Sequence, residues 1–496
     1  MLFRSVWNRR GRMNKILFTH SYFYKLDPKQ WKFQQPYPPL ATILAAAVAR
    51  QHGFEVALFD VGLRDNPLQI REALDARKPD YLVIYDDSFN YLTKMCLTVM
   101  REAAFLMAEE AKKRNCRVIV SSSDAADHYE KYFDHGVDYV VRGEGEETLA
   151  ELLNHLREGK DTARIAGLAF CREGQTVVTP ARPVIRDLDT LPMPAWDLID
   201  IAPYKRIWIN RHGYFALNIA TTRGCPFKCN WCAKPVYGNR YNSRAPRLVV
   251  DEIEYLMKRF DADYFWMCDD IFGLKPGWVQ EFNAQVKVRG LKFRYKIQSR
   301  VDLLVQEDTI EALAESGADN IWVGAESGAQ KILDAMDKGT TVEQIYVATR
   351  LMKQNGIKPA FFLQFGYPGE TRRDIDATLK MVLDLMPDEV GISVSYPLPG
   401  TKFYDKVKDQ LQLKQNWTDS DDLDMMFQGT FSRNYYRQLH RYVHSIYRAR
   451  RGYASFRKLL HSPFRLTYKD IRSGLAVAYF IPVSLAQRIK LKLLSA

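Results

Sequence analysis

Short apolar runs alternate with helical patterns over the first third of the chain. A first run near residue 15 precedes an alanine-rich helical stretch over 40–51, which Gly53 ends. Such runs between helical stretches are typical of buried parallel strands. The predicted strands are Lys15–Thr19, Val56–Phe59, Tyr81–Tyr85, Val118–Ser121 and Tyr139–Val141, and a helix over 145–156 closes the series. The alternation predicts an α/β domain over 14–158, with a flavodoxin-like doubly wound sheet that binds ligands at the carboxyl ends of its strands.

Residues 159–209 break this alternation. They carry five prolines and little regular pattern, so we interpret them as a linker with a small hairpin. Over residues 210–405 the alternation of strand and helix patterns resumes. The predicted strands are Phe215–Thr221, Tyr264–Met267, Phe293–Gln298, Asn320–Gly324, Ala360–Gln364 and Val390–Ser395. Six such units favour a partial (β/α)6 TIM barrel, whose functional residues lie at the carboxyl ends of the strands.

The last part of the chain, residues 406–496, is aromatic and helical in pattern, and we expect an appended, mostly helical domain. The net charge of +12 gathers there: from Arg448 onward the chain has eleven Arg or Lys against one acid, Asp470. The rest is therefore close to neutral, and nucleic acid is not an expected partner. The basic tail also holds Phe464, Tyr468, Tyr479, Phe480 and Ile481. It could lie on an anionic membrane surface, or pack its apolar residues on its own domain.

The composition is that of a protein with two or three ordinary cores. No apolar run approaches the length of a membrane span, and the basic first fifteen residues lack the apolar core of a signal peptide. The few cysteines indicate a reducing compartment, so we expect a cytoplasmic protein.

Three cysteines form the most informative motif of the chain. Cys225, Cys229 and Cys232 follow the first predicted barrel strand in a C-x3-C-x2-C pattern. Three thiolates on one tight loop can ligate three irons of a [4Fe–4S] cluster and leave the fourth iron open. A zinc site is the alternative, but structural zinc usually takes four ligands from paired C-x2-C motifs. The other cysteines are scattered singly, at Cys96, Cys116, Cys171 and Cys268.

The cysteine motif resembles that of the radical S-adenosylmethionine (SAM) enzymes. In that family SAM chelates the open iron, and an electron from the cluster splits it to give a 5′-deoxyadenosyl radical. The resemblance implies that Cys225, Cys229 and Cys232 are the cluster ligands. It also implies that Trp231 occupies the position of an aromatic residue near the SAM adenine.

Polar and glycine-flanked residues recur at the ends of the following predicted strands. They are Asp269 and Asp270, then Ser299 and Arg300, then Glu326 and Ser327, and finally Gly366 and Pro368. Each pair has an ordinary explanation as a helix cap or a turn. Their recurrence at successive strand ends instead favours contacts to SAM, which needs acceptors for its ammonium and ribose hydroxyls and donors for its carboxylate. We carry them over as SAM contacts.

The wider resemblance is to a group that includes the anaerobic magnesium-protoporphyrin ester cyclase, hopanoid-modifying enzymes and methylthiotransferases. Residues 210–405 are similar to its radical SAM core, and residues 14–158 to the cobalamin-binding domain that precedes it. The resemblance implies a cobalamin pocket with Tyr37, Asp60, Ser121, Ser122, Gly143 and Glu144.

Two departures from this pattern concern the cobalamin pocket. Gly62 stands where the cobalt-ligating histidine would be, and Ser121–Ser123 replace a usual glycine pair. Axial ligation by histidine is thereby excluded, whereas cobalamin with a free cobalt face is not. A scaffold that binds no corrinoid remains the alternative. We expect His20 and His128 to be polar surface or loop residues, not ligands.

The resemblance implies an enzyme that functionalises an unactivated carbon, by cobalamin-dependent methyl transfer or by oxidative cyclisation. The aromatic residues suit a large hydrophobic substrate, or belong only to the core. A flavodoxin or ferredoxin would be the external one-electron reductant. Two alternatives stay open. A methylthiotransferase would need a second three-cysteine cluster, which Cys96 and Cys116 cannot build. A non-catalytic metal-binding scaffold would need no residues such as Glu326 at strand ends.

Overall fold

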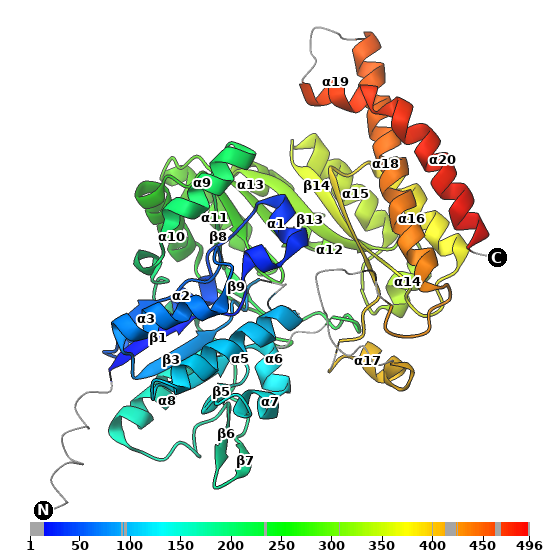
Figure 1. The fold of residues 1–496 in the computed structure, drawn as a ribbon. Helices are drawn as coiled ribbons and strands as arrows, with labels where there is room; N and C mark the ends of the chain where they lie inside the picture. Colours follow the sequence, from blue (N-terminus) through cyan, green and yellow to red (C-terminus); the bar gives the residue numbers. More distant parts are fainter. Residues whose placement is uncertain are drawn as a thin grey trace, which may run out of the picture. The chain divides into compact units, whose positions relative to one another are not determined.

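The computed structural model describes residues 14–90, 93, 97–232, 236–306, 308–398, 400–411, 423, 425–461 and 468–494. Cys96 and Phe464, singled out above, lie outside these residues. The described chain is a mixed α/β structure with a helical C-terminal part (Figure 1). The fold class expected from the sequence is confirmed.

The first sheet has the strand order β2-β1-β3-β4-β5-β6-β7 in the described residues. Its parallel strands are β1 (Lys15–Thr19), β2 (Glu55–Leu58), β3 (Tyr81–Tyr85), β4 (Arg117–Ser121) and β5 (Tyr139–Val141). The order 2-1-3-4-5 is the flavodoxin-like one, and its ligands bind at the carboxyl ends of the strands. Apolar residues of β1, β3 and β4 such as Leu17, Leu82 and Val118 are fully buried, which explains their continuous apolar runs.

Residues 168–178 extend the first sheet. The strands β6 (Leu168–Arg172) and β7 (Gln175–Val178) form an antiparallel hairpin, and β6 pairs with β5. The expected linker over 159–209 therefore contributes two strands to this sheet. It also contains most of α9 (Ile201–His212), whose N-terminus is capped by Asp200.

The second sheet has the strand order β8-β11-β12-β13-β14-β15, in the order of the chain. Strand β11 pairs in parallel with β8 and β12, and β14 pairs in parallel with β13 and β15. The strands are β8 (Ala216–Ile219), β11 (Tyr264–Met267), β12 (Arg294–Ser299), β13 (Ala318–Glu326), β14 (Lys358–Phe365) and β15 (Glu389–Val394). Helices such as α10 (Pro246–Phe260), α15 (Val342–Gln354) and α16 (Arg372–Leu385) connect them, which is the arrangement of a partial TIM barrel.

The chain separates into two compact units. The first holds the described residues of 14–226 and 236–297, and the second holds residues 227–232 and the described residues from 298 onward. These units differ from the domains expected from the sequence, because the division falls inside the barrel segment. It also separates Cys225 from Cys229 and Cys232, so each unit is described by itself below.

The C-terminal part of the second unit consists of helices. They are α17 (Lys402–Val407), α18 (Arg433–His461), α19 (Tyr468–Leu475) and α20 (Val477–Leu493). Helix α20 runs along α18, and the Gln438 side-chain amide donates to the carbonyl of Gln487 at 3.0 Å (Figure 1). Among the described helices, none combines the length and the apolar character that a bilayer crossing requires.

Candidate cofactor sites

The second half of the cysteine loop is held within the second unit by Asn230. Its side-chain amide donates to the Ala335 carbonyl at 2.7 Å, and its own carbonyl accepts from the Phe403 backbone N–H at 2.9 Å. A turn closes between its neighbours, because the Cys232 N–H donates to the Cys229 carbonyl at 3.2 Å. Asn230 is buried, so these bonds are shielded from water. They hold the backbone that carries the two thiols in one conformation.

A guanidinium group lies beside the thiol of Cys229. Arg300 Nη1 is 3.9 Å from Cys229 Sγ, and the guanidinium carbon is 3.6 Å from the centre of the Phe227 ring. Asp302 accepts two hydrogen bonds from the same guanidinium, at 2.9 and 3.0 Å, and so orients it. The Arg300 guanidinium thus places a positive charge and an N–H donor beside the Cys229 sulfur.

Glu326 and Lys338 form a buried ion pair of 2.8 Å at the end of β13. Glu326 has a φ of 53°, and the pairing of β13 with β14 shifts register between Gly324 and Glu326. Such a backbone is strained for a residue with a side chain and persists only where the surrounding structure holds it. A Cβ on Gly324 would lie 2.4 Å from both charged groups, so only glycine leaves them room.

The charge of Lys338 also interacts with Cys229 of the cysteine loop. Burial by itself would lower the pKa of its ammonium, but Glu326 and Cys229 outweigh this and raise the pKa above its usual value. The ammonium is 5.8 Å from the centre of the Trp231 ring. Lys338 therefore stays charged beside the loop.

Trp231 has an unsatisfied donor within the described structure. Its ring packs against an apolar cluster that includes Ile332, Tyr367 and Phe403, while its indole N–H is buried without a hydrogen-bond partner there. Leaving such a group unpaired costs about 1–3 kcal/mol. A buried donor of this kind beside the thiols fits a ligand with acceptor atoms.

The remaining expected SAM residues of the second unit have other partners. The hydroxyl of Ser327 is bonded to Thr378 at 3.1 Å, and the Gly366 N–H donates to the Glu370 carboxylate at 2.7 Å. Pro368 is exposed, and Ser299 is buried beside Arg300. The structure thus gathers Arg300, Glu326 and Trp231 around Cys229, while Ser327 bonds to α16.

Asp269, in the first unit, binds the backbone that leads into the cysteine loop. Its carboxylate accepts from the N–H groups of Thr221 and Thr222, at 2.7 and 2.8 Å, and from the Thr221 hydroxyl. Burial raises the pKa of this carboxyl to about 7, although these hydrogen bonds oppose the rise. Asp270, the next residue, is exposed. Asp269 therefore positions the start of the loop through its backbone.

Arg223, two residues before Cys225, ties that backbone to the first sheet. Its guanidinium bonds to Glu144 and, at 2.7 Å, to Glu146, and all three side chains are at least 95 % buried. The rings of Phe89 and Tyr237 lie 5.4 and 5.2 Å from it. Burial raises the pKa of the Glu144 carboxyl, against the effect of Arg223. Glu144 is thus committed to an ion pair, which the sequence did not indicate.

The conformation of Gly224 explains why glycine precedes the first cysteine. Its φ is +77°, and a Cβ there would lie 2.1 Å from the Arg240 carbonyl oxygen. Any side chain would be strained and would displace this backbone.

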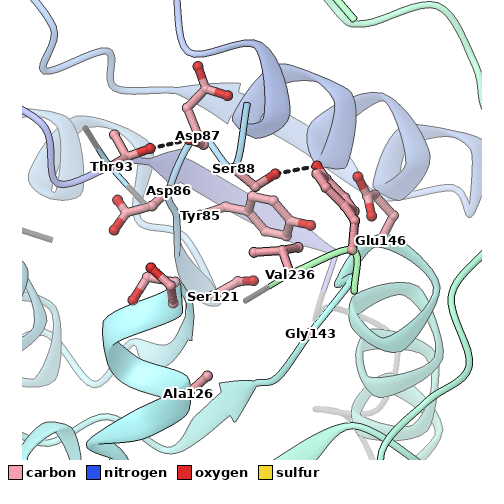
Figure 2. Close-up of a pocket in the computed structure, with 13 residues that line it drawn as sticks. Tyr85, Asp86, Asp87, Ser88, Thr93, Ser121, Ala126, Gly143, Glu146 and Val236 are labelled. Carbon is pink, nitrogen blue, oxygen red and sulfur yellow. Dashed lines mark hydrogen bonds between the residues drawn. The ribbon is translucent and has the colours of Figure 1, made fainter. Parts of the chain in front are cut away.

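A pocket opens at the carboxyl ends of β3, β4 and β5 (Figure 2). Its lining is Tyr85, Asp86, Asp87, Ser88, Thr93, Ser121, Ser122, Ser123, Ala126, Gly143, Glu146, Val236 and Tyr237. Ser88 and Tyr237 share a hydrogen bond of 2.5 Å at its wall. Burial raises the pKa of Asp86 to about 6, against hydrogen bonds from Ser21. Three of the expected cobalamin residues, Ser121, Ser122 and Gly143, therefore line one pocket.

Tyr37 and Asp60 do not line this pocket. The Tyr37 ring is tilted against those of Trp208 and Trp266, with ring centres 5.2 and 4.9 Å apart. Its hydroxyl is buried without a partner among the described residues. The Asp60 carboxylate accepts hydrogen bonds from His20 at 3.0 Å and from Tyr204 at 2.8 Å. Tyr37 and Asp60 therefore stabilise the packing near the edge of the first sheet, outside the pocket.

His20 lies in a loop directly after β1, which is one of the two alternatives expected from the sequence. The other, a surface position, is wrong, because His20 is 3 % exposed and bonded to Asp60. Burial alone would raise the pKa of Asp60, but the bonds from His20, Gly62 N–H and Tyr204 outweigh it and lower the pKa. A Cβ at Gly62 would lie 2.4 Å from the Tyr204 hydroxyl, so this conformation has no room for a histidine there.

The donor chemistry of the loop fits an iron–sulfur cluster. Cys225, Cys229 and Cys232 are partly exposed and form no disulfide, and Arg300 and Lys338 supply positive charge beside Cys229. In the described residues, no three Cys, His, Asp or Glu side chains gather around a common point suited to a metal ion. The assignment of an iron–sulfur cluster therefore rests on the three thiols and on the positive charge beside Cys229.

Lys338, Arg223 and Glu146 were not found from the sequence as site residues. Lys338 lies in a turn after α14 (Gln330–Ala335), and no motif marks it. Arg223 and Glu146 stand beside motifs that were recognised, but their pairing joins positions 77 residues apart. Only the fold brings them together.

Two protein-family models match this chain, one over each of two segments. Residues 219–382 match the model of the radical SAM superfamily, and residues 32–153 match that of the B12 binding domain. The segment that matches the B12 binding domain thus precedes the segment that matches the radical SAM superfamily.

Several curated proteins are similar to it. An uncharacterized methyltransferase, PH0819, of Pyrococcus horikoshii is 30 % identical over 57 % of this chain and 60 % of its own length. The anaerobic magnesium-protoporphyrin IX monomethyl ester cyclase of Rubrivivax gelatinosus is 32 % identical over 56 % and 50 %. The hopanoid C-3 methylase of Methylococcus capsulatus is 25 % identical over 75 % and 69 %. The chain thus spans about half of the length of the first two relatives.

Two solved structures share the fold. The radical SAM methyltransferase TsrM of Kitasatospora setae, with cobalamin and a [4Fe–4S] cluster bound, aligns with a TM-score of 0.66 at 22 % identity, over 80 % of this chain and 78 % of its own. The cobalamin-dependent SAM radical enzyme OxsB, with aqua-cobalamin bound, aligns with a TM-score of 0.73 at 17 % identity, over 98 % and 73 %.

Proposed function

We propose that this protein is a cobalamin-dependent radical SAM enzyme that functionalises an unactivated carbon of a hydrophobic biosynthetic intermediate. The reaction is methyl transfer or oxidative cyclisation. Cys225, Cys229 and Cys232 ligate a [4Fe–4S] cluster, and SAM binds beside it. When bound, the cluster supplies the electron for the reductive cleavage of SAM.

One observation carries this proposal: a polar cluster of opposite charges surrounds Cys229 within the second unit. Arg300 is 3.9 Å from its sulfur, and Lys338 is paired with Glu326 at 2.8 Å. A plain structural zinc site needs no buried ion pair on a strained strand end. An amino acid ligand does, because it presents an ammonium and a carboxylate together.

The roles of these residues follow from their charges. Glu326 accepts a hydrogen bond from the SAM ammonium, while the ion pair with Lys338 at 2.8 Å holds the Glu326 carboxylate in place. Arg300, beside the Cys229 sulfur, is the donor for the SAM carboxylate. The unpaired indole N–H of Trp231 donates to an acceptor of the same ligand. Burial of Arg300, Glu326 and Lys338 excludes water from their charged groups and strengthens these contacts.

Cobalamin occupies the pocket at the carboxyl ends of β3, β4 and β5. The hydroxyl groups of Ser121 and Ser122 and the bare backbone of Gly143 accommodate its polar tail, because small residues let a ligand approach the sheet closely. When bound, cobalamin supplies the methyl group for transfer. The crowding at Gly62 supports a cobalt face that no histidine ligates.

The substrate is small compared with the protein, but large and apolar for a metabolite. Two of the similar proteins are named as a porphyrin ester cyclase and a hopanoid methylase. These names support a substrate that is large and apolar. A flavodoxin or a ferredoxin of the cytoplasm supplies the electron. Exposed basic residues near the chain end add a contact to an anionic membrane surface.

Anaerobic reconstitution tests the proposal. We expect about four irons per chain and reductive conversion of SAM to 5′-deoxyadenosine in the presence of dithionite. The Cys229→Ala variant should lose both the iron and the product. Cys171→Ala is the matched control, because Cys171 is an exposed cysteine of β6, and it should retain both. Retention of SAM cleavage by Cys229→Ala would refute the cluster assignment.

A further inference from the structure

Helix α20 is apolar on two opposite faces. One face packs on α18: Leu491 is completely buried, Ser484 is 9 % exposed, and Phe480 lies 5.5 Å from the guanidinium of Arg448. A helix that is apolar all round is normally covered on all sides. The other face of α20 is therefore the feature that needs an explanation.

That other face is exposed. Ile481, Leu485, Ile489 and Leu493 follow one another at intervals of four residues, so they lie along one side of the helix. Their exposed fractions are 43, 55, 61 and 74 %, and Tyr479 adds a side chain that is 64 % exposed. A contiguous apolar stripe of this length on a surface marks a contact with another apolar body.

The charge around this stripe has a single sign. Helix α20 contains Arg488, Lys490 and Lys492 and no acidic residue. At 100° per residue, Arg488 and Lys492 fall on one edge of the stripe and Lys490 on the other. Apolar side chains between basic residues are typical of helices that lie in the interface of an anionic bilayer.

We propose that the outward face of α20 docks on the surface of an anionic lipid bilayer. The four aliphatic side chains enter the boundary of head groups and acyl chains, and the basic residues beside them contact lipid phosphates. A second copy of this chain fits less well, because it would bring one basic edge against another. The contact does not depend on the chemistry proposed above.

Sedimentation with vesicles of stated composition tests this proposal. The full-length protein, purified without oxygen, should sediment with vesicles that contain phosphatidylserine and remain in solution with pure phosphatidylcholine. Leu485→Gln with Ile489→Gln should weaken binding about tenfold or more, because two buried aliphatic groups are lost. Replacing Arg488, Lys490 and Lys492 by glutamine should weaken it roughly fivefold for each charge.

The matched control removes equally exposed apolar side chains elsewhere. Ile209 and Val288 are 46 and 86 % exposed, and Ile209→Gln with Val288→Gln should leave vesicle binding unchanged. Equal binding by the α20 variant, or binding that ignores phosphatidylserine, would overturn the proposal. So would a wild-type protein that ignores vesicles but changes from dimer to monomer when Leu485 and Ile489 are replaced, because the face would then join two copies.

Discussion

At the scale of single residues, Lys338 and Glu326 show how the candidate SAM site is held before any ligand arrives. Their side chains are 9 and 5 % exposed, so each charge depends on the other. Removing one partner of a buried pair leaves the other charge uncompensated in a medium that solvates it poorly. The strained φ of Glu326 and the missing side chain of Gly324 serve the same contact.

The Lys338→Met variant measures this dependence. We expect it to lose about 3–5 kcal/mol of stability and to bind SAM more weakly. Lys380→Met is its control, because Lys380 pairs with Asp384 on the exposed face of α16 and should cost below about 1 kcal/mol. Thermal unfolding and SAM titration provide the two readouts. Equal losses in the two variants would contradict a special role for the buried pair.

At the scale of elements, one arginine connects the cysteine loop to the loop between β5 and α8 (Glu146–Glu158). Arg223 follows β8 by a few residues, and Glu144 and Glu146 stand at the start of α8. A guanidinium can serve two carboxylates at once because its donors form a planar fork. This contact lies at the wall of the pocket, which Glu146 and Tyr237 line.

Two variants separate the charge of this cluster from its shape. Arg223→Met alone should destabilise the protein by about 3–5 kcal/mol, since it leaves two carboxylates buried without a cation. The triple variant Arg223→Met, Glu144→Gln, Glu146→Gln should recover most of that loss, because no charge then remains buried. Unfolding midpoints at neutral pH check both. If the triple variant were less stable than the single one, packing rather than charge would hold the loop.

At the scale of the whole molecule, two cofactors imply two separable losses. Ala126 lies in α6 (Ser123–Asp127) and lines the pocket, so Ala126→Trp should fill it. This variant should fail to bind hydroxocobalamin and still produce 5′-deoxyadenosine from SAM. Cys229→Ala should do the reverse.

The matched control for Ala126→Trp is a tryptophan at an exposed position. Ala76→Trp places the same side chain on the exposed side of α3 (Ile70–Arg77) and should bind the corrinoid normally. The absorption spectrum of the bound corrinoid, after gel filtration, is the readout. Stoichiometric corrinoid binding by Ala126→Trp would remove the cofactor from this pocket.

The strands could be predicted closely because their signal is local. Tyr81–Tyr85 and Tyr139–Val141 have the predicted bounds, and the barrel strands differ from prediction by two residues or fewer at each end. A buried parallel strand is apolar on both faces, so its run is visible without its neighbours. The cysteine motif is equally local, because its spacing alone suggests its chemistry.

The sequence did not show where a residue depends on a distant partner. His20 is the predicted loop residue, but its burial depends on Asp60, 40 positions away. Residues 168–178 form the hairpin predicted within the linker, but its pairing with β5 was not predicted. The residues next to Lys338 in the sequence do not indicate that its side chain pairs with that of Glu326.

The sequence by itself determined the order of α/β units, the three thiols and the class of chemistry. The periodicity of apolar residues and the spacing of the cysteines are local features, so they can be recognised without the fold. Only the tertiary structure decided which charges are buried together, which strand ends share one pocket and which face of α20 remains uncovered. These depend on distances between segments that the chain keeps far apart, and burial changes the energy of a charge only once the fold has removed water from around it.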